Sequence, residues 1–147
     1  QSRGLGDVYK RQLCTISYME RKHKKMDDFE RIFEAYGADY QVTLGRFMGN
    51  RKMYMKFLGM LFQDENLSKL GDALEQGDMT SAFEAAHTLK GVTGNMGLTP
   101  LYDAVCTIVE PLRTGEDRED YTKMYEDVCR QFKRAEKLRA DLAEISE

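Results

Sequence analysis

The chain has 147 residues, a formal net charge of -3 and 41% hydrophobic residues, a balance that supplies one hydrophobic core in a single domain. No apolar run approaches the roughly 20 residues that a membrane span requires, and the slightly acidic chain lacks the basic footprint of a nucleic-acid binder. The three cysteines are widely spaced and form no C-x-x-C pair, which argues against a disulfide scaffold or a zinc site and fits a reducing compartment. We therefore expect a cytoplasmic protein that engages neither nucleic acid nor a membrane.

The first segment, residues 1–25, differs from the rest of the chain. It is basic and has no sustained apolar period, and it also lacks the apolar central region that defines a signal peptide. From Asp27 onward the pattern becomes helical. We expect residues 1–25 to be a non-native or disordered leader and residues 26–147 to form one helical bundle domain.

Apolar residues recur at spacings of three and four along the first half of the helical region. These spacings predict a short helix over residues 27–37, opened by two aspartates and closed by a glycine. A second short segment follows over residues 39–49. The stripe that starts at residue 50 predicts one long helix that ends at residues 77–78, with a kink or break near residues 64–66.

Three further helices are predicted over residues 79–96, 99–114 and 119–145, and Gly97 is expected to end the first of them. Pro111 lies inside the second and is expected to bend or end it. No segment shows the alternation of a strand. Four substantial helices with short connections predict an all-α fold, an antiparallel up-down four-helix bundle with one or two short N-terminal helices.

The helix predicted over residues 79–96 carries one of the two histidines of the chain. At about 100° per residue His87 lies outside the apolar arc, so its side chain is expected to be exposed. Thr80, Gly91 and Gly94 fall on the same face as the histidine. The core arc comprises Met79, Ala82, Ala85, Ala86, Leu89, Thr93 and Met96, with Phe83 at its edge.

Two glycines on the face of His87 need an explanation, because each glycine inside a helix costs roughly 0.5–1 kcal/mol relative to alanine. They leave the imidazole unshielded, so a large partner can reach it. Lys90, three residues after the histidine, can donate charge-assisted hydrogen bonds to an anion attached to the ring. Because histidine serves as a nucleophile in covalent intermediates, this pattern indicates a histidine that carries a phosphoryl group transiently.

The stretch AHTLKGVTGNMG, residues 86–97, resembles the H-x-L/I-K-G-x-x-x-x-x-G signature of histidine phosphotransfer (Hpt) domains. The similarity extends over about residues 27–145, in the order of a leader with R-F-x-G, a long helix, a G-D turn and the histidine helix. The resemblance implies a helical bundle that accepts a phosphoryl group from the aspartyl phosphate of a receiver domain and passes it on. Such a domain is a phosphocarrier without autokinase activity and not an enzyme in its own right.

By position in the motif, His87 is the expected phosphoacceptor, Lys90 is expected to stabilise the phosphoryl group and Gly91 to leave access for the receiver. Where some family members place a glutamine near the histidine, this chain has Val109, with Glu110 next to it. Further candidate binding residues are Gly94, Thr80, Glu84 and Arg113.

The resemblance also implies the partners of the chain. These are response-regulator receiver domains, or a hybrid sensor histidine kinase, acting on a monomeric chain. The magnesium ion of the transfer reaction belongs to the receiver, so no metal site and no cofactor is expected here.

Other classes of protein fit the residues less well. Helical carboxylate metal sites use Glu-x-x-His pairs, which this sequence lacks. The two histidines also provide no base and orienting group for a serine or cysteine hydrolase. Two alternatives stay open: a non-phosphorylated helical adaptor that binds a receiver or another partner through the same face, and the detached histidine domain of a larger sensor kinase of the chemotaxis type.

Overall fold

The computed structural model describes residues 26–146, and every regular element within that range is a helix, which confirms the predicted all-α fold. The predicted leader, residues 1–25, lies outside the described residues. The helices are α2 (Asp28–Tyr36), α3 (Tyr40–Gly45), α4 (Arg51–Phe62), α5 (Asn66–Gln76), α6 (Met79–Asn95), α7 (Thr99–Arg113) and α8 (Tyr121–Ile145).

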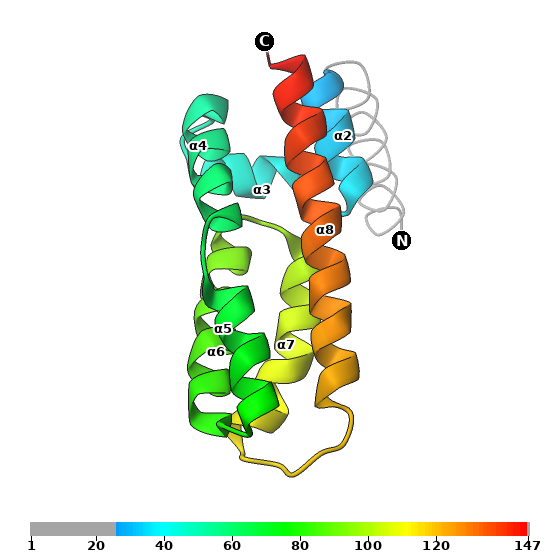
Figure 1. Cartoon of the computed structure of the whole chain (residues 1–147). Coiled ribbons are helices and arrows are strands. Elements are labelled where there is room, and N and C mark those ends of the chain that lie inside the picture. Colours follow the sequence, from blue (N-terminus) through cyan, green and yellow to red (C-terminus); the bar gives the residue numbers. More distant parts are fainter. Residues whose placement is uncertain (1–25, 147) are drawn as a thin grey trace, which may run out of the picture.

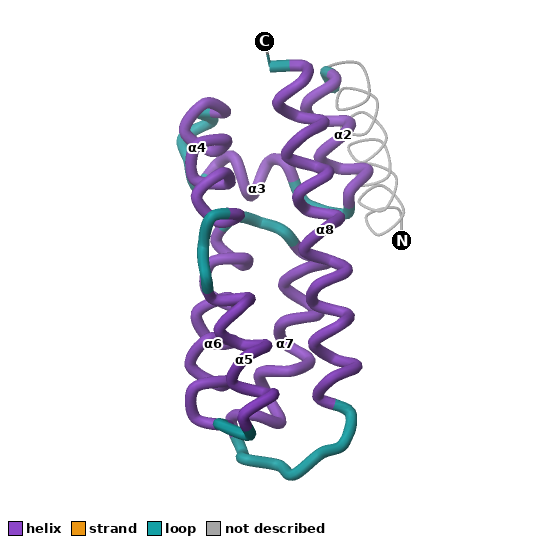
Figure 2. Tube along the Cα trace, in the orientation of Figure 1, coloured by secondary structure: helices purple, strands orange, loops and turns teal. Residues whose placement is uncertain are grey.

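Consecutive helices α5, α6, α7 and α8 lie side by side, and the chain reverses direction at each connection between them (Figure 1). Helix α4 lies on the same side of the molecule as α5. It extends beyond the C-terminal end of α6 (Figure 1). Helix α2 packs against the C-terminal half of α8, and α3 crosses from α2 toward α4 (Figure 2). The first bundle helix of the sequence prediction is therefore two helices, of which α4 reaches past the bundle.

The break in that predicted helix lies where the sequence placed it, between Phe62 and Asn66. The carboxylate of Asp64 accepts hydrogen bonds from the backbone N–H and the side-chain amide of Asn66, at 2.7 and 2.6 Å. A short aspartate side chain that bonds to the backbone two residues later favours a turn over a continuous helix. The next helix therefore starts afresh at Asn66.

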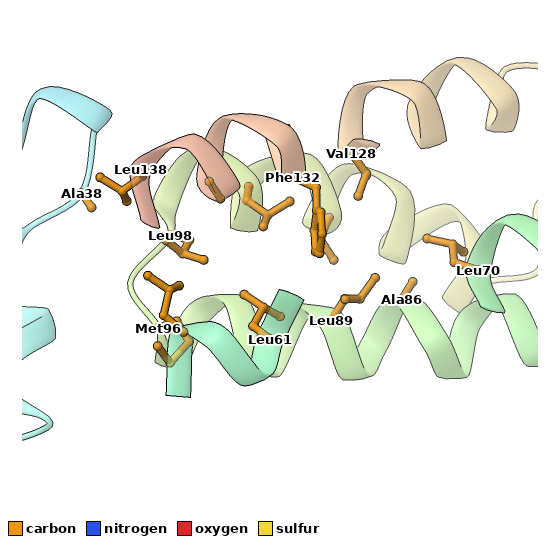
Figure 3. Close-up of a cluster of buried hydrophobic side chains, with 14 of the residues drawn as sticks. Ala38, Leu61, Leu70, Ala86, Leu89, Met96, Leu98, Val128, Phe132 and Leu138 are labelled. Atoms are coloured by element: carbon orange, nitrogen blue, oxygen red, sulfur yellow. The ribbon is translucent and has the colours of Figure 1, made fainter. Parts of the chain in front are cut away.

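The core is built from one apolar stripe of each bundle helix (Figure 3). Leu70 of α5, Leu89 of α6 and Val128 of α8 are almost completely buried, and burial of one such side chain contributes about 1.5–3 kcal/mol. Phe62 and Phe132 meet edge to face with ring centroids 5.1 Å apart, which joins α4 to α8. This contact packs the end of α4 against the bundle.

Arg51 at the start of α4 ties that helix to α2. Its guanidinium lies 2.7 Å from the carboxylate of Asp27 and 4.6 Å from the centroid of the Phe29 ring. The hydrogen bond from Arg51 holds the pKa of Asp27 below its usual value, and Asp27 also caps α2 by accepting from the backbone of Glu30. One arginine thus links the two segments that precede the bundle.

Two side chains from other parts of the chain hold the connection between α6 and α7. Arg46, directly after α3, donates to the carbonyl oxygens of Gly94 and Asn95, at 2.7 and 3.2 Å, and so satisfies the C-terminal end of α6. The hydroxyl of Tyr54 donates to the carbonyl of Met96 at 2.7 Å. Burial raises the pKa of Tyr54, so this donor stays protonated. Gly97 then turns the chain with φ +70°, which agrees with its predicted role at the helix end.

Two boundaries near the last turn differ slightly from the prediction. Helix α7 continues through Pro111 and ends at Arg113, and α8 begins at Tyr121 and not at residue 119. Arg118 holds the carboxylate of Asp120 in a two-pronged hydrogen bond at 2.9 and 2.8 Å, which keeps this part of the chain in the turn. This local contact, between residues two apart in the sequence, favours a helix that begins after Asp120.

The first prediction concerns Gly97. A Cβ atom at this position would lie 2.0 Å from the hydroxyl oxygen of Thr43, and the positive φ already disfavours any side chain. We expect Gly97→Ala to lower the free energy of unfolding by about 3 kcal/mol in urea titrations, from the clash and the strain together. Gly77→Ala is the control, because Gly77 has a similar φ of +69° and open space around it, and it should lose only about 1–2 kcal/mol. Equal losses in the two variants would show that the contact with Thr43 contributes nothing.

Candidate functional site

Helix α6 starts at a well-formed cap. Asp78 accepts hydrogen bonds from the backbone N–H of Ser81 at 3.1 Å and from its hydroxyl at 2.7 Å. The hydrogen bond from the Ser81 side chain lowers the pKa of Asp78, so the carboxylate that caps the helix is the charged form. This cap and the Arg46 contacts at the other end fix the register of α6.

The predicted division of α6 into two faces is confirmed. His87 is exposed, whereas the residues of the predicted core arc are buried except Met79, which is half-buried. The arc is rich in small side chains, which lets α6 lie close to both α5 and α7. The buried members are Ala82, Ala85, Ala86, Leu89, Thr93 and Met96.

The two glycines on the histidine face have different surroundings. At Gly91 an added Cβ would meet no atom within 4 Å, so this position is open, as expected. At Gly94 an added Cβ would lie 3.1 Å from the ring of Tyr102, which reaches over from α7. Gly94 therefore makes room for Tyr102 of α7, and the open part of the histidine face is at Gly91.

A hollow of about 710 Å³ adjoins the histidine. His87, Lys90 and Gly91 line one side of it, from α6. Tyr102 lines it from α7, and Val42 lines it from α3 with 54% of its surface exposed. The contribution of α3 was not predicted from the sequence, because α3 is far from α6 in the sequence and meets it only in the folded protein. The arginine of the R-F-x-G stretch, Arg46, was the one residue of this region that the sequence pattern had pointed to.

Lys90 is half-buried, and its ammonium lies 4.0 Å from a carboxylate oxygen of Glu110 on α7. The same carboxylate lies 3.5 Å from Nε of Arg113. Glu110 thus stands between two cations next to the histidine face. Val109, at the position of the glutamine of some family members, is completely buried and faces the core.

The ring of His87 is stacked on the ring of Phe83, with centroids 5.5 Å apart and planes at 21°. The guanidinium of Arg113 in turn lies 5.5 Å from the centroid of Phe83. The spacing of four residues between Phe83 and His87 on one helix was the signal that could have revealed this pair. Arg113 therefore contacts Phe83, and Phe83 in turn contacts His87.

The remaining two candidates lie on α6 at the surface. Thr80 and Glu84 are exposed, and neither is among the described residues that line the hollow. The backbone carbonyl of Glu84 accepts a hydrogen bond from the Thr88 hydroxyl at 3.0 Å. Both therefore lie on the surface of α6 outside the hollow.

A family model for the Hpt domain matches residues 57–146, more than half of the chain, and the chain belongs to this family. Hpt domains are phosphocarrier modules of two-component signal transduction. The matched region contains α5, α6, α7 and α8, whereas α2 and α3 precede it. Comparisons with curated proteins and with solved structures give no match.

The described part of the chain shows neither a membrane-spanning helix nor a metal-binding cluster. No helix between residues 26 and 146 has the length and apolar character needed to cross a membrane. Within the same residues, no three side chains of the metal-binding types His, Cys, Asp and Glu group in a way that could hold an ion.

The second prediction separates the two glycines. We expect Gly91→Ala to raise the free energy of unfolding by about 0.5–1 kcal/mol, because the methyl group enters open space on a helix. Gly94→Ala should gain nothing or lose stability, since Tyr102 must move away from the new Cβ atom. Urea unfolding followed by circular dichroism measures both changes. Equal stabilisation by the two substitutions would contradict the assignment of Gly94 to packing.

Proposed function

We propose that this chain is a histidine phosphotransfer module that accepts a phosphoryl group on His87 from the aspartyl phosphate of a receiver domain and passes it to another. The observation that carries the proposal is the exposed His87 with Lys90 beside it and open space at Gly91. All three residues lie inside the region that matches the Hpt family.

The transfer needs a nucleophile and a good leaving group. The lone pair of one ring nitrogen of His87 forms the N–P bond, the P–O bond to the aspartyl carboxylate breaks, and its electron pair stays on that carboxylate. The other ring nitrogen keeps its proton. The reverse reaction, toward a second receiver, uses the same atoms in the opposite order. The metal ion that supports this step is expected in the receiver, and this chain supplies the acceptor.

Lys90 is the group best placed to stabilise the phosphoryl group. Before transfer its ammonium lies 4.0 Å from Glu110, a distance at which the attraction is weak. A phosphoryl group on His87 brings nearly two negative charges to the same neighbourhood, and its oxygens compete with the single charge of Glu110 for Lys90. Arg113, 3.5 Å from Glu110, keeps that carboxylate paired when Lys90 turns away.

The hollow beside His87 supports docking of a receiver. Its walls come from α3, α6 and α7, and the open surface at Gly91 lets the loops around a receiver aspartate approach the imidazole. The exposed side chain of Val42 offers an apolar contact at the edge. Because α3 lies outside the matched family region, we propose that it contributes to the choice of receiver.

The third prediction tests the acceptor itself. Incubation with a phosphorylated receiver should give the wild-type chain an acid-labile phosphate, and His87→Gln should remove it completely. His23→Gln is the matched control, because it replaces the other histidine of the sequence, and it should label like the wild type. Equal labelling of wild type and His87→Gln would refute the proposal. Receiver binding without any label on the wild type would instead favour the adaptor.

The fourth prediction tests access. Gly91→Leu should leave the fold intact, because the position is exposed and free of neighbours, yet it should slow transfer from a phosphorylated receiver by about tenfold or more. Labelling by phosphoramidate, a small donor that needs no docking, should continue. Ser68→Leu, at an exposed position on α5 outside the hollow, is the control and should transfer normally. Unchanged transfer in Gly91→Leu would show that the receiver docks elsewhere.

A further inference from the structure

Phe83 contacts the ring of His87, the proposed phosphoacceptor. It lies one helical turn before His87, and the two rings are stacked with centroids 5.5 Å apart and planes at 21°. Phe83 is itself half-buried and packs against the core. Phe83 is therefore held by the interior of the protein, while His87 is exposed at the surface.

A stacked arrangement leaves the reactive atoms free. The lone pair of an imidazole nitrogen lies in the plane of the ring, and the N–P bond forms in that plane. A phenyl ring that covers the face restricts rotation of the imidazole without covering its edge. The geometry of the pair therefore orients the ring and keeps the nitrogens accessible.

A second contact holds Phe83 from α7. The guanidinium of Arg113 lies 5.5 Å from the Phe83 centroid, and Arg113 is paired with Glu110 at 3.5 Å. Because Glu110 also approaches Lys90, the residues on both sides of His87 are connected through one carboxylate of α7. The orientation of Phe83 thus depends on the packing of α7 against α6.

Hydrogen bonding offers no other restraint in the described structure. Over residues 26–146 no hydrogen bond joins the His87 ring to a side chain or to the backbone, and Val109 faces the core. We propose that Phe83 is the positioning residue of His87: its ring holds the imidazole in the orientation that a docked receiver requires. This inference rests on the proposed function, in which His87 is the phosphoacceptor.

If Phe83 positions His87, its removal should lower the rate of the chemical step and leave the docking of the receiver unchanged. A freely rotating imidazole presents its nitrogen in line with the aspartyl phosphate for only part of the time, so the maximal transfer rate falls. The receiver concentration at half-maximal rate should stay the same, because Phe83 itself is not required for contact with the receiver. A small donor can approach the nitrogen from many directions, so its reaction should change little.

The fifth prediction compares three variants of the full chain. Phe83→Leu should lower the maximal rate of transfer from a saturating phosphorylated receiver by about three- to tenfold, the size expected of one aromatic contact. Phe83→Tyr keeps the stack and should restore the rate to within about twofold of the wild type. Phe62→Leu is the control for general loss of packing, because Phe62 is also half-buried but pairs with Phe132 on α8. Labelling by phosphoramidate should stay within about twofold of the wild type in all variants.

A nuclear magnetic resonance measurement tests the contact independently of transfer. The ring protons of His87 should show an upfield ring-current shift that disappears in Phe83→Leu and persists in Phe83→Tyr. An unchanged transfer rate in Phe83→Leu, an equal loss in Phe62→Leu, or a parallel loss of phosphoramidate labelling would overturn the inference. Failure of every receiver to label the wild type would refute the proposed function instead, and the ring-current shift would still decide whether the rings are stacked.

Discussion

Ala82, Ala85 and Ala86 let α6 approach α5 and α7 closely, and the position of His87 follows from that contact. The three side chains are buried, and their small size brings the backbones of neighbouring helices together. Once this stripe faces the core, the geometry of the α-helix turns His87 outward. The same close approach brings Glu110 within reach of Lys90, so the burial of a few alanines assembles the charged groups as well.

The site combines rigid support with local exposure. The capped start at Asp78 and the contacts of Arg46 with the last carbonyl groups hold α6 at both ends. Between these ends Gly91 leaves the surface open, at a cost in helix stability that a purely structural helix would avoid. The proposed function accounts for that cost, because functional sites often break a local rule of stability and an open surface at Gly91 would give a receiver access to His87.

Several features were predictable because they depend on spacing within one helix. The exposed His87, the neighbouring Lys90 and the turn at Gly97 all follow from helical periodicity and from the backbone freedom of glycine. The break near Asp64 was predictable for a similar reason, since short polar side chains compete locally with the helix backbone. The packing at Gly94 was not predictable. The ring of Tyr102 that lies against Gly94 comes from α7, and the spacing of residues along α6 carries no information about α7.

The sequence by itself determined that the chain is helical, which residues of α6 face the core, and that the histidine faces outward with a lysine beside it, because these properties depend on neighbours a few residues apart. Only the tertiary structure decided that α3 forms a wall of the hollow, that Glu110 faces Lys90, and that Arg113 reaches the histidine face through the ring of Phe83. These contacts join segments that are distant in the sequence. They depend on how closely the helices pack and at which level their side chains meet, which local periodicity does not specify.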